Sequence, residues 1–402
     1  MKVLQINIRV NKGSVSRITE QVGLKVLEQG WDSYIAYGRP SNPSESELIP
    51  IGSYNQVRWH YLMSNLTGRH GLYSTRATKK LVEKIKEITP DIIHLQNIHG
   101  YYINYKVLFE YLNSTNIPVV WTLHDCWSFT GHCSHFVSAK CEKWKTECEN
   151  CPLKKEYPRS LFFDFSKRDY ILKKKLFVSN RNLHLVPVSH WLEGLVKSSF
   201  LGEKDIRVIH NGVDLSVFYP RHHKCSNKIR IIGVAGVWGV SKGLYDFYNL
   251  RERLDRSLYE ITLIGLSDAQ MKELPDGIIG IQRTDSVDQL ADYYSDADLF
   301  VNLTYADTFP TVNIESLACG TPVLTYKTGG SPEIIDEKTG FIIEQGDMQA
   351  LVDTVEVFRQ MSSDAKASQR EACRKRAEEE YQRDACFAKY INLYKELCGL
   401  KS

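Results

Sequence analysis

Two carboxylate side chains, Asp307 and Glu315, stand eight positions apart in the second half of the chain. Asp307 follows an apolar stretch that ends at Asn302 and predicts a strand, whereas Glu315 falls inside the helix expected next. Both side chains can then project near the carboxyl ends of a parallel sheet, where open α/β folds bind ligands. The first amides of that helix, from Thr311 to Asn313, suit a phosphate or a sugar oxygen. A surface acid and a helix-capping acid are the structural alternative.

Lys242 lies in a glycine-bounded turn, residues 236–243, that follows a predicted strand and opens a helix. Such a turn lets an ammonium group and free backbone amides hold a diphosphate. A solvated lysine is the other interpretation of the same pattern. Gly13 has a similar place after the first predicted strand, where a glycine lets backbone approach a phosphate or simply makes a turn.

His124 ends a predicted strand in the first half of the chain and is followed by Asp125. A histidine at such a place is most often satisfied by packing, so a role in chemistry needs further support. Asp125 is a candidate to orient His124, although neighbours in an extended strand point to opposite sides.

Short apolar stretches alternate with longer segments of helical period, which predicts parallel sheets built from β-α-β units. The pattern occurs twice, and 402 residues fit two domains. Helices are expected at 15–29 and 286–295, the second with Ser286 as its N-cap. The predicted strands are 3–7, 33–37, 91–96, 118–123, 184–188 and 207–209, then 229–235, 261–265, 277–281, 299–302, 322–325 and 341–343.

The polar stretch 219–228 separates the two alternating series and is the predicted linker. The first domain is expected at 1–218, with a cysteine-rich insert at about 126–158. The second is expected at 229–380, and the last helix, 381–402, is expected to cross back to the first domain.

The segment around Asp307 and Glu315 resembles the nucleotide-sugar signature of retaining glycosyltransferase family 4, a pair of glutamates spaced E-x7-E. Residues 210–214, His-Asn-Gly-Val-Asp, with Phe218 are similar to the family's N-G-V-D-x-x-x-F segment. The resemblance covers nearly the whole chain and is strongest over 189–333. It implies the GT-B fold, an α/β architecture of two Rossmann-like, doubly wound parallel-sheet domains that face a cleft.

The resemblance also implies roles for individual residues. Glu315 would hold the ribose hydroxyls, and Asp307 would meet the donor sugar, where the family usually has glutamate. Lys242 would stabilise the leaving diphosphate, and His124 would orient the sugar and stabilise charge rather than attack. The remaining substrate-binding candidates are Gly13, Thr311 at the helix start, and Thr308, Phe309 and Pro310 through their backbone. The family carries an arginine where this chain has Val237, and Arg283 is the candidate to replace it. His94, Asn97 and His99 end another predicted strand and are candidates to line the acceptor side.

The activity implied is that of a retaining glycosyltransferase. It would move a sugar from a UDP- or GDP-sugar to a glycan or lipid-linked acceptor in surface polysaccharide synthesis, with no cofactor required for catalysis. A nucleotide-sugar epimerase of the GT-B type is one alternative. A zinc-stapled nucleic-acid-binding protein is another, since residues 1–218 hold 29 basic and 20 acidic residues, or +9, within a total of +3. Because the donor-type residues favour transfer, no nucleic-acid partner is expected.

Cys133, Cys141, Cys148 and Cys151 fall close together in the insert, and the last two have the C-x2-C spacing of a chelating pair. Four thiolates suit a tetrahedral structural zinc ion, with His132 or His135 as substitutes for one cysteine. Free thiols, reversible oxidation and an iron–sulfur cluster are the alternatives.

No apolar run approaches the roughly 18 residues that span a bilayer, and the first residues lack a signal peptide's pattern. The expected location is therefore the cytoplasm. The basic first half either meets an anionic partner, such as the inner face of the cell membrane, or is simply a solvated face. Hydrophobic residues make up 43% and charged residues 25%, an ordinary composition that excludes a disordered chain.

Overall fold

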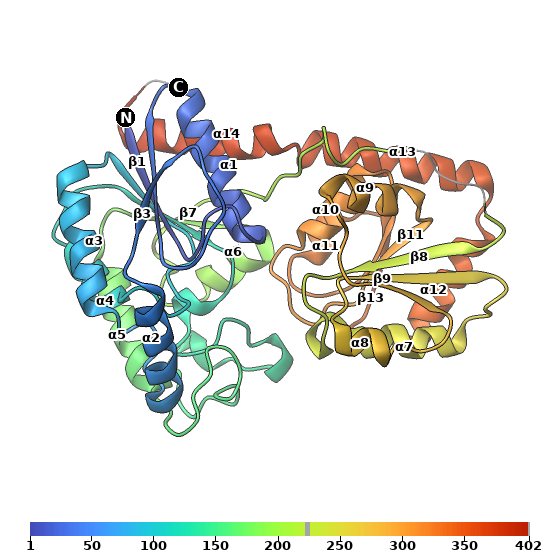
Figure 1. Cartoon of the computed structure of the whole chain (residues 1–402), viewed down its shortest axis with the longest axis horizontal. Helices are drawn as coiled ribbons and strands as arrows, with labels where there is room; N and C mark the ends of the chain where they lie inside the picture. The colour runs from blue at the N-terminus through green and yellow to red at the C-terminus, as the bar shows by residue number, and fades with distance from the viewer. Residues whose placement is uncertain (222–225, 401–402) are drawn as a thin grey trace. The chain divides into compact units, whose positions relative to one another are not determined.

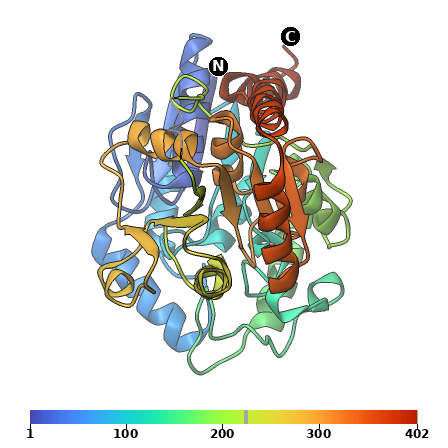
Figure 2. The ribbon, with the colours of Figure 1, turned by 90° about the vertical axis from the view of Figure 1, so that its right-hand side faces the viewer.

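The computed structural model describes residues 1–221 and 226–400. The chain forms two compact units: the first is Met1–His210 together with the chain from Phe387 onward, and the second is Asn211–Cys386. Each unit contains one parallel sheet with helices against it (Figure 1). Figure 2 shows the same ribbon turned by 90° about the vertical axis. Over the described residues, no helix is both long enough and apolar enough to cross a bilayer.

The sheet of the first unit has seven strands in the order β3-β2-β1-β4-β5-β6-β7. The strands are β1 (Lys2–Asn7), β2 (Asp32–Tyr37), β3 (Glu47–Pro50), β4 (Ile92–Leu95), β5 (Val119–Leu123), β6 (Leu183–Pro187) and β7 (Asp205–Ile206). Its helices are α1 (Ser14–Glu28), α2 (Tyr54–Thr67), α3 (Thr75–Ile88), α4 (Tyr105–Leu112), α5 (Ser166–Ser179) and α6 (His190–Lys197), joined by most of α14 (Arg383–Leu397).

The sheet of the second unit has six strands in the order β10-β9-β8-β11-β12-β13. The strands are β8 (Ile229–Val234), β9 (Tyr259–Ile264), β10 (Ile278–Ile281), β11 (Leu299–Asn302), β12 (Val323–Tyr326) and β13 (Gly340–Ile343). Its helices are α7 (Leu244–Arg253), α8 (Asp268–Lys272), α9 (Val287–Asp296), α10 (Thr311–Ala318), α11 (Ser331–Ile334), α12 (Met348–Gln360) and α13 (Ser363–Glu380).

In both sheets the strand order reverses at one point, between β1 and β4 and between β8 and β11. Crossover connections between parallel strands are right-handed, so a reversal moves the following helices to the other face of the sheet. Figure 1 shows this in the second unit, where α7 and α8 lie on one side of the sheet and α9 and α10 on the other. Ligands bind at such switch points, beyond the carboxyl ends of the strands.

The strands form because they are apolar on both faces, as central strands of parallel sheets must be. Every residue of β4 and β5 is buried, and the register places Ile93 opposite both Leu4 and Val119. In the second unit, buried side chains such as Leu263, Val301 and Leu324 form the core together with apolar residues of α7 and α12.

Helix boundaries follow local signals in the sequence. The Ser286 hydroxyl accepts a hydrogen bond from the Gln289 amide and caps α9, as expected. The first helix begins at Ser14 and ends at Glu28, one residue earlier at each end than expected, and Gly30 follows with φ 70°.

The division between the units lies at Asn211 and not in the expected linker. Backbone hydrogen bonds join Val213 to the chain after α13, from its amide to the Tyr381 carbonyl and from the Arg383 amide to its carbonyl. These bonds hold residues 211–218 against the second unit. Residues 222–225 of the expected linker and 401–402 of the expected last helix lie outside the described residues.

Candidate functional site

The loop after β8 carries Lys242 at the end of a short 3-10 helix, and Gly243 follows it. Gly243 has φ 70°, and a Cβ atom there would lie 2.3 Å from the carbonyl oxygen of Leu303. Glycine is therefore required for this close approach. The Tyr305 amide donates to the Ser241 carbonyl at 2.8 Å, so the loop after β8 is joined to the loop after β11.

Lys242 and Asp307 form an ion pair, with 2.7 Å between Nζ and Oδ2. Lys242 also donates to the Thr304 hydroxyl at 3.4 Å, and the Phe309 amide donates to the other Asp307 carboxylate oxygen at 3.2 Å. The Lys242 and Asp307 side chains are 33% and 22% exposed, so a small ligand can reach both. The structure thus brings together two predicted site residues that are 65 positions apart in the chain.

The loop that carries Asp307 packs closely on the start of α11. Gly329 has φ 54°, and a Cβ atom on it would lie 1.7 Å from the Asp307 carbonyl oxygen. Gln345 donates to the Tyr305 carbonyl at 3.1 Å and to the Thr328 hydroxyl at 2.8 Å. These contacts fix the position of the Asp307 loop beyond the carboxyl ends of the strands.

Glu315 lies on α10 and is half-buried. The Tyr294 hydroxyl of α9 donates to its Oε2 at 3.3 Å. Burial, with the Glu315 charge as a second cause, raises the pKa of Tyr294 well above its usual value, so this phenol stays protonated and remains a donor. Tyr294 therefore holds the carboxylate in place on its helix.

The helix α10 begins at Thr311, and its N-cap Pro310 has no side-chain acceptor for the first amides. The Asn313 amide donates to the Pro310 carbonyl at 3.1 Å, so the Thr311 and Val312 amides are the ones left as candidates. Uncapped amides at a helix start favour an anion or a sugar oxygen. Thr308 is buried, and the Phe309 side chain packs near Tyr381, with ring centroids 6.0 Å apart. The side chain of Phe309 is thus a packing group, and only its backbone remains a candidate for the donor sugar.

Two other predicted residues stand apart from this group. Arg283 is exposed and follows β10, the edge strand of the second sheet, and within the described residues no hydrogen bond joins it to Lys242 or Asp307. Gly13 precedes α1 in the first unit with φ 89°, and a Cβ atom there would have no neighbour within 4 Å. Backbone at Gly13 is therefore open to approach.

His124 follows β5 in the first unit, and its Nε2 lies 2.8 Å from Oε1 of Gln96, which follows β4. Burial lowers the pKa of His124 to about 4, although Asp125 opposes that shift, so the ring is neutral at physiological pH.

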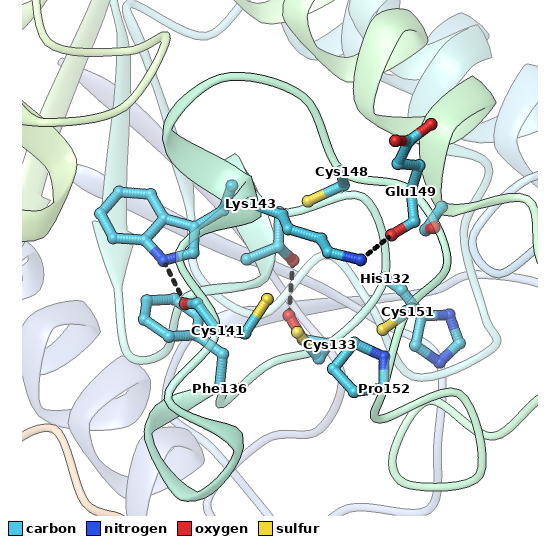
Figure 3. A pocket seen from close by; sticks show the side chains of 12 residues that line it. His132, Cys133, Phe136, Cys141, Lys143, Cys148, Glu149, Cys151 and Pro152 are labelled. Atoms are coloured by element: carbon cyan, nitrogen blue, oxygen red, sulfur yellow. Dashed lines mark hydrogen bonds between the residues drawn. The ribbon is translucent and has the colours of Figure 1, made fainter.

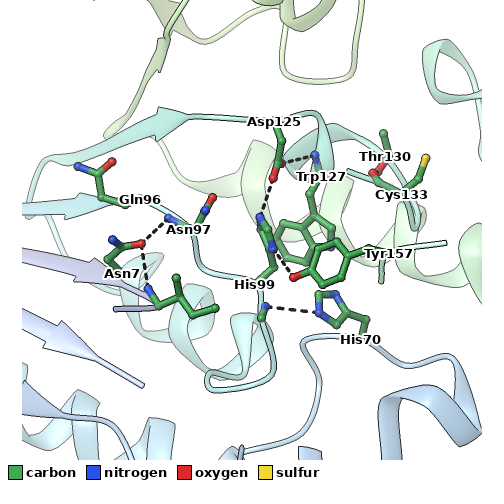
Figure 4. Close-up of polar contacts among 12 residues, drawn as sticks. Asn7, His70, Gln96, Asn97, His99, Asp125, Trp127, Thr130, Cys133 and Tyr157 are labelled. Carbon is green, nitrogen blue, oxygen red and sulfur yellow. Dashed lines mark hydrogen bonds and ion pairs between the residues drawn. The ribbon is translucent and has the colours of Figure 1, made fainter. Parts of the chain in front are cut away.

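Asp125 pairs with His99 and not with His124 (Figure 4). The distance from His99 Nε2 to Asp125 Oδ2 is 2.8 Å, and the Trp127 amide donates to Oδ1 at 2.9 Å. The other ring nitrogen of His99 lies 2.9 Å from the Tyr157 hydroxyl. Burial raises the pKa of Asp125, but its interactions with His99 outweigh burial and the pKa falls to about 2. Within the described residues the Asp125 carboxylate is bonded to His99 and Trp127, so no hydrogen bond supports an orienting role of Asp125 toward His124.

The family model described as Glycosyltransferase Family 4 matches residues 15–217, half of the chain. The chain belongs to glycosyltransferase family 4. A second model, Glycosyl transferases group 1, matches residues 266–380 of this glycosyltransferase, the region that holds Asp307 and Glu315.

Relatives of this family 4 chain include WcaC of Escherichia coli (strain K12), named as a colanic acid biosynthesis glycosyl transferase. It is 23% identical over 379 residues, covering 88% of this chain and 89% of the relative. The capsular polysaccharide biosynthesis glycosyltransferase CapM of Staphylococcus aureus is 25% identical over 185 residues, covering 40% and 48% of the two chains.

Solved structures show the same GT-B fold. Sucrose-phosphate synthase from Thermosynechococcus elongatus superposes with a TM-score of 0.73 at 17% identity, covering 99% of both chains. HepE of Anabaena, solved in complex with UDP-glucose, has a TM-score of 0.65 at 14% identity, covering 98% of this chain and all of that one. The predicted family and fold are therefore confirmed.

The four predicted zinc ligands of this glycosyltransferase, Cys133, Cys141, Cys148 and Cys151, line one pocket of the insert (Figure 3). The described cysteines are free thiols. The Cys148 sulfur accepts a hydrogen bond from the Gly131 amide at 3.3 Å. This donor set suits zinc. However, no group of three or more histidine, cysteine, aspartate or glutamate side chains in residues 1–221 and 226–400 is arranged to hold a metal ion. The zinc site stays a prediction from the spacing.

A zinc site predicts about one equivalent of zinc in the purified glycosyltransferase, and its loss in Cys148→Ser, because a thiolate ligand cannot be replaced by a hydroxyl. Elemental analysis measures this directly. Cys398→Ser, a cysteine outside the insert, is the matched control. Metal-free wild-type protein, or equal zinc in both variants, would remove the assignment.

The sequence did not single out Tyr294, Thr304 or Gln96, although each contacts a predicted site residue. Tyr294 and Thr304 carried no signal, because ordinary tyrosines and threonines occur throughout strands and helices. Gln96 did carry one, since a polar side chain that directly follows an apolar strand of a parallel sheet lies at the ligand-binding edge.

Proposed function

We propose that this glycosyltransferase moves a sugar, with retention of configuration, from a UDP- or GDP-sugar to a glycan or lipid-linked acceptor in surface polysaccharide assembly. The observation that carries the proposal is the contact of Lys242 with Asp307, in loops that lie beyond the strand ends together with the uncapped start of α10. The names of WcaC and CapM and the UDP-glucose complex of HepE support the substrate class.

In this proposal Lys242 neutralises the diphosphate as the bond to the sugar breaks. An ammonium beside a developing phosphate charge acts where charge appears in the transition state. Glu315 accepts hydrogen bonds from the ribose hydroxyls, and Asp307 with the nearby backbone amides positions the sugar. Lys242 then exchanges its contact with Asp307 for the phosphate when the donor binds.

From the first unit, His124 orients the donor sugar as a neutral ring. The acceptor hydroxyl attacks from the face that the diphosphate leaves, and the departing phosphate takes its proton, so no protein nucleophile is required. We propose that catalysis needs no divalent metal, since Lys242 and the start of α10 supply the charge stabilisation.

The test is nucleoside-diphosphate release from UDP-, GDP-, ADP- and TDP-sugars, with slow hydrolysis in place of the unknown acceptor. Release from one donor, unchanged by a chelator and lost in Glu315→Ala, is the expected result. Glu337→Ala, an exposed acid of the same unit, serves as the control. If the protein neither releases a nucleotide from any of these donors nor binds one, the proposal is contradicted. Interconversion of the sugar without transfer would favour an epimerase.

We further propose that the first unit touches an anionic membrane surface through the face of α2 and the segment 157–163. Trp59 and Phe162 are 53% and 65% exposed, and the Leu161 amide donates to the Asn65 carbonyl at 2.8 Å, which joins the two segments. Exposed basic residues, Arg58, Lys155 and Arg159, accompany these aromatics. Aromatic side chains with basic neighbours suit an anionic interface. Absence of co-sedimentation with anionic vesicles at low salt would exclude it.

A further inference from the structure

Two buried glutamine side chains form a hydrogen-bonded relay that ends at His124. Gln5 lies in the middle of β1, Gln96 follows β4, and both are at most 1% exposed. The relay lies inside the first unit and does not include the residues that the sequence pointed to, apart from His124 itself.

The relay has a fixed direction because it begins at a backbone carbonyl, which can only accept. Gln5 Nε2 donates to the Thr19 carbonyl at 2.9 Å, so Gln5 Oε1 faces the other way. Gln96 Nε2 donates to that oxygen at 3.3 Å, which turns Gln96 Oε1 toward His124. The remaining contact, 2.8 Å from Gln96 Oε1 to His124 Nε2, then requires a proton on Nε2, since a carbonyl oxygen cannot donate.

The relay is also held mechanically. The Gln96 amide donates to the Ile6 carbonyl at 3.0 Å, and the Trp121 indole donates to the Gln96 carbonyl at 3.0 Å. Gln96 Nε2 lies 3.2 Å from His94 Nε2, and His94 Nδ1 lies 2.6 Å from the Tyr394 hydroxyl of α14. The two main-chain bonds fix the place of Gln96, and the bond from its Nε2 to Gln5 Oε1 sets the orientation of its side-chain amide.

We propose that Gln5 and Gln96 are positioning residues that keep His124 as a neutral ring protonated on Nε2, with Nδ1 as the unprotonated nitrogen. The hydrogen-bond partners of the two ring nitrogens decide which nitrogen of a neutral histidine carries the proton. A ring fixed in this way interacts with substrate as an uncharged group, and its contribution to transfer is orientation rather than positive charge. The link to transfer rests on the proposed function, whereas the tautomer does not.

Several titratable groups face His124 and favour different charge states. Asp125 favours the charged ring, whereas His99 and burial oppose it. His94 is fully buried, and its pKa is lowered to about 3 chiefly by burial, so it adds no positive charge. Tyr394 beside it stays protonated, because burial raises its pKa. The neutral form of His124 therefore persists across physiological pH.

The deciding experiment is a histidine ¹⁵N spectrum of the full chain, in which protonated and unprotonated ring nitrogens have well-separated shifts. The His124 signal is assigned by its loss in His124→Gln. The expected result is a proton on Nε2 from pH 8 to pH 6. A proton on Nδ1, or titration near the ordinary histidine value, would overturn the proposal without touching the proposed function.

Variants of the relay give the second test. Gln96→Met and Gln5→Met remove the direction of the relay, so His124 is expected to show both tautomers, and kcat for donor turnover is expected to fall about tenfold or more with little change in KM. Gln96→Glu keeps an acceptor beside Nε2 but adds a negative charge, so the pKa of His124 and the pH profile of kcat are expected to move upward.

Gln369→Met is the matched control, since Gln369 is a buried glutamine on α13 of the second unit. It is expected to leave the His124 spectrum and the pH profile unchanged. A single Nε2-protonated signal in Gln96→Met and Gln5→Met would show that the relay does not set the tautomer. If one variant fails to fold, the other and the wild-type spectrum still decide.

Discussion

Lys242→Ala is expected to reduce kcat for sugar transfer about a hundredfold or more, because it removes the cation that meets the leaving diphosphate. The change should spare the fold. Lys242 is one-third exposed, and loss of its ion pair leaves Asp307 partly solvated, so the free energy of unfolding is expected to change by no more than about 1 kcal/mol. Single-turnover kinetics with the donor found by nucleotide release measures the effect on chemistry.

Lys327→Ala is the matched control for Lys242→Ala. Lys327 lies in the same unit and forms an ion pair with Glu344 at 3.0 Å, with both side chains well exposed. It is expected to retain wild-type kcat. A Lys242→Ala enzyme with wild-type kcat would mean that the diphosphate is neutralised by another group and would remove Lys242 from the proposed mechanism.

Lys173→Met is expected to lower the free energy of unfolding by about 3 kcal/mol. Lys173 lies on α5 and is buried, and it donates to the carbonyls of Trp127 at 2.7 Å and Thr130 at 3.0 Å. Its Nζ also lies 3.4 Å from the centroid of the Trp127 ring. Methionine fills a similar volume but leaves two buried carbonyl oxygens without a donor.

Burial lowers the pKa of Lys173 to about 7, with Asp169 opposing the shift. Both the ammonium and the amine can donate to the two carbonyls, so the loss in Lys173→Met is expected at neutral and mildly alkaline pH alike. Denaturant unfolding followed by tryptophan fluorescence measures it. Lys174→Met makes the same change at an exposed position of α5 and should be near neutral. Equal stability of the two variants would show that the start of the insert does not depend on Lys173.

Most of the sheet architecture was predictable because strands of a parallel sheet are apolar on both faces and stand out between helical segments. Twelve strands were expected near their observed places, β8 and β11 among them. The strand β3, Glu47–Pro50, was missed because an edge strand of four residues that ends in proline gives little apolar signal. The strand β7 was expected two residues too late.

The candidate site was predictable where several residue types stand at fixed spacing along one segment. Asp307 lies in a loop and Glu315 in the helix that directly follows it, so the sequence alone predicts that the two acids are near each other. Arg283 could not be judged in this way, because its distance from Lys242 depends on strand order, and β10 lies at the edge of the sheet. The pairing of Asp125 with His99 likewise depends on how two strand ends meet.

By itself the sequence determined the family and the two alternating series of strands and helices, and it pointed to the acids and the lysine of the proposed donor site. Apolar periodicity and local spacing are properties of one segment at a time. Only the tertiary structure decided that Lys242 meets Asp307, that Val213 joins the chain after α13, and that Gln5 and Gln96 form a hydrogen-bonded series that ends at His124 Nε2. Hydrogen-bond direction depends on which groups meet in space, and that information exists only after the strands have paired.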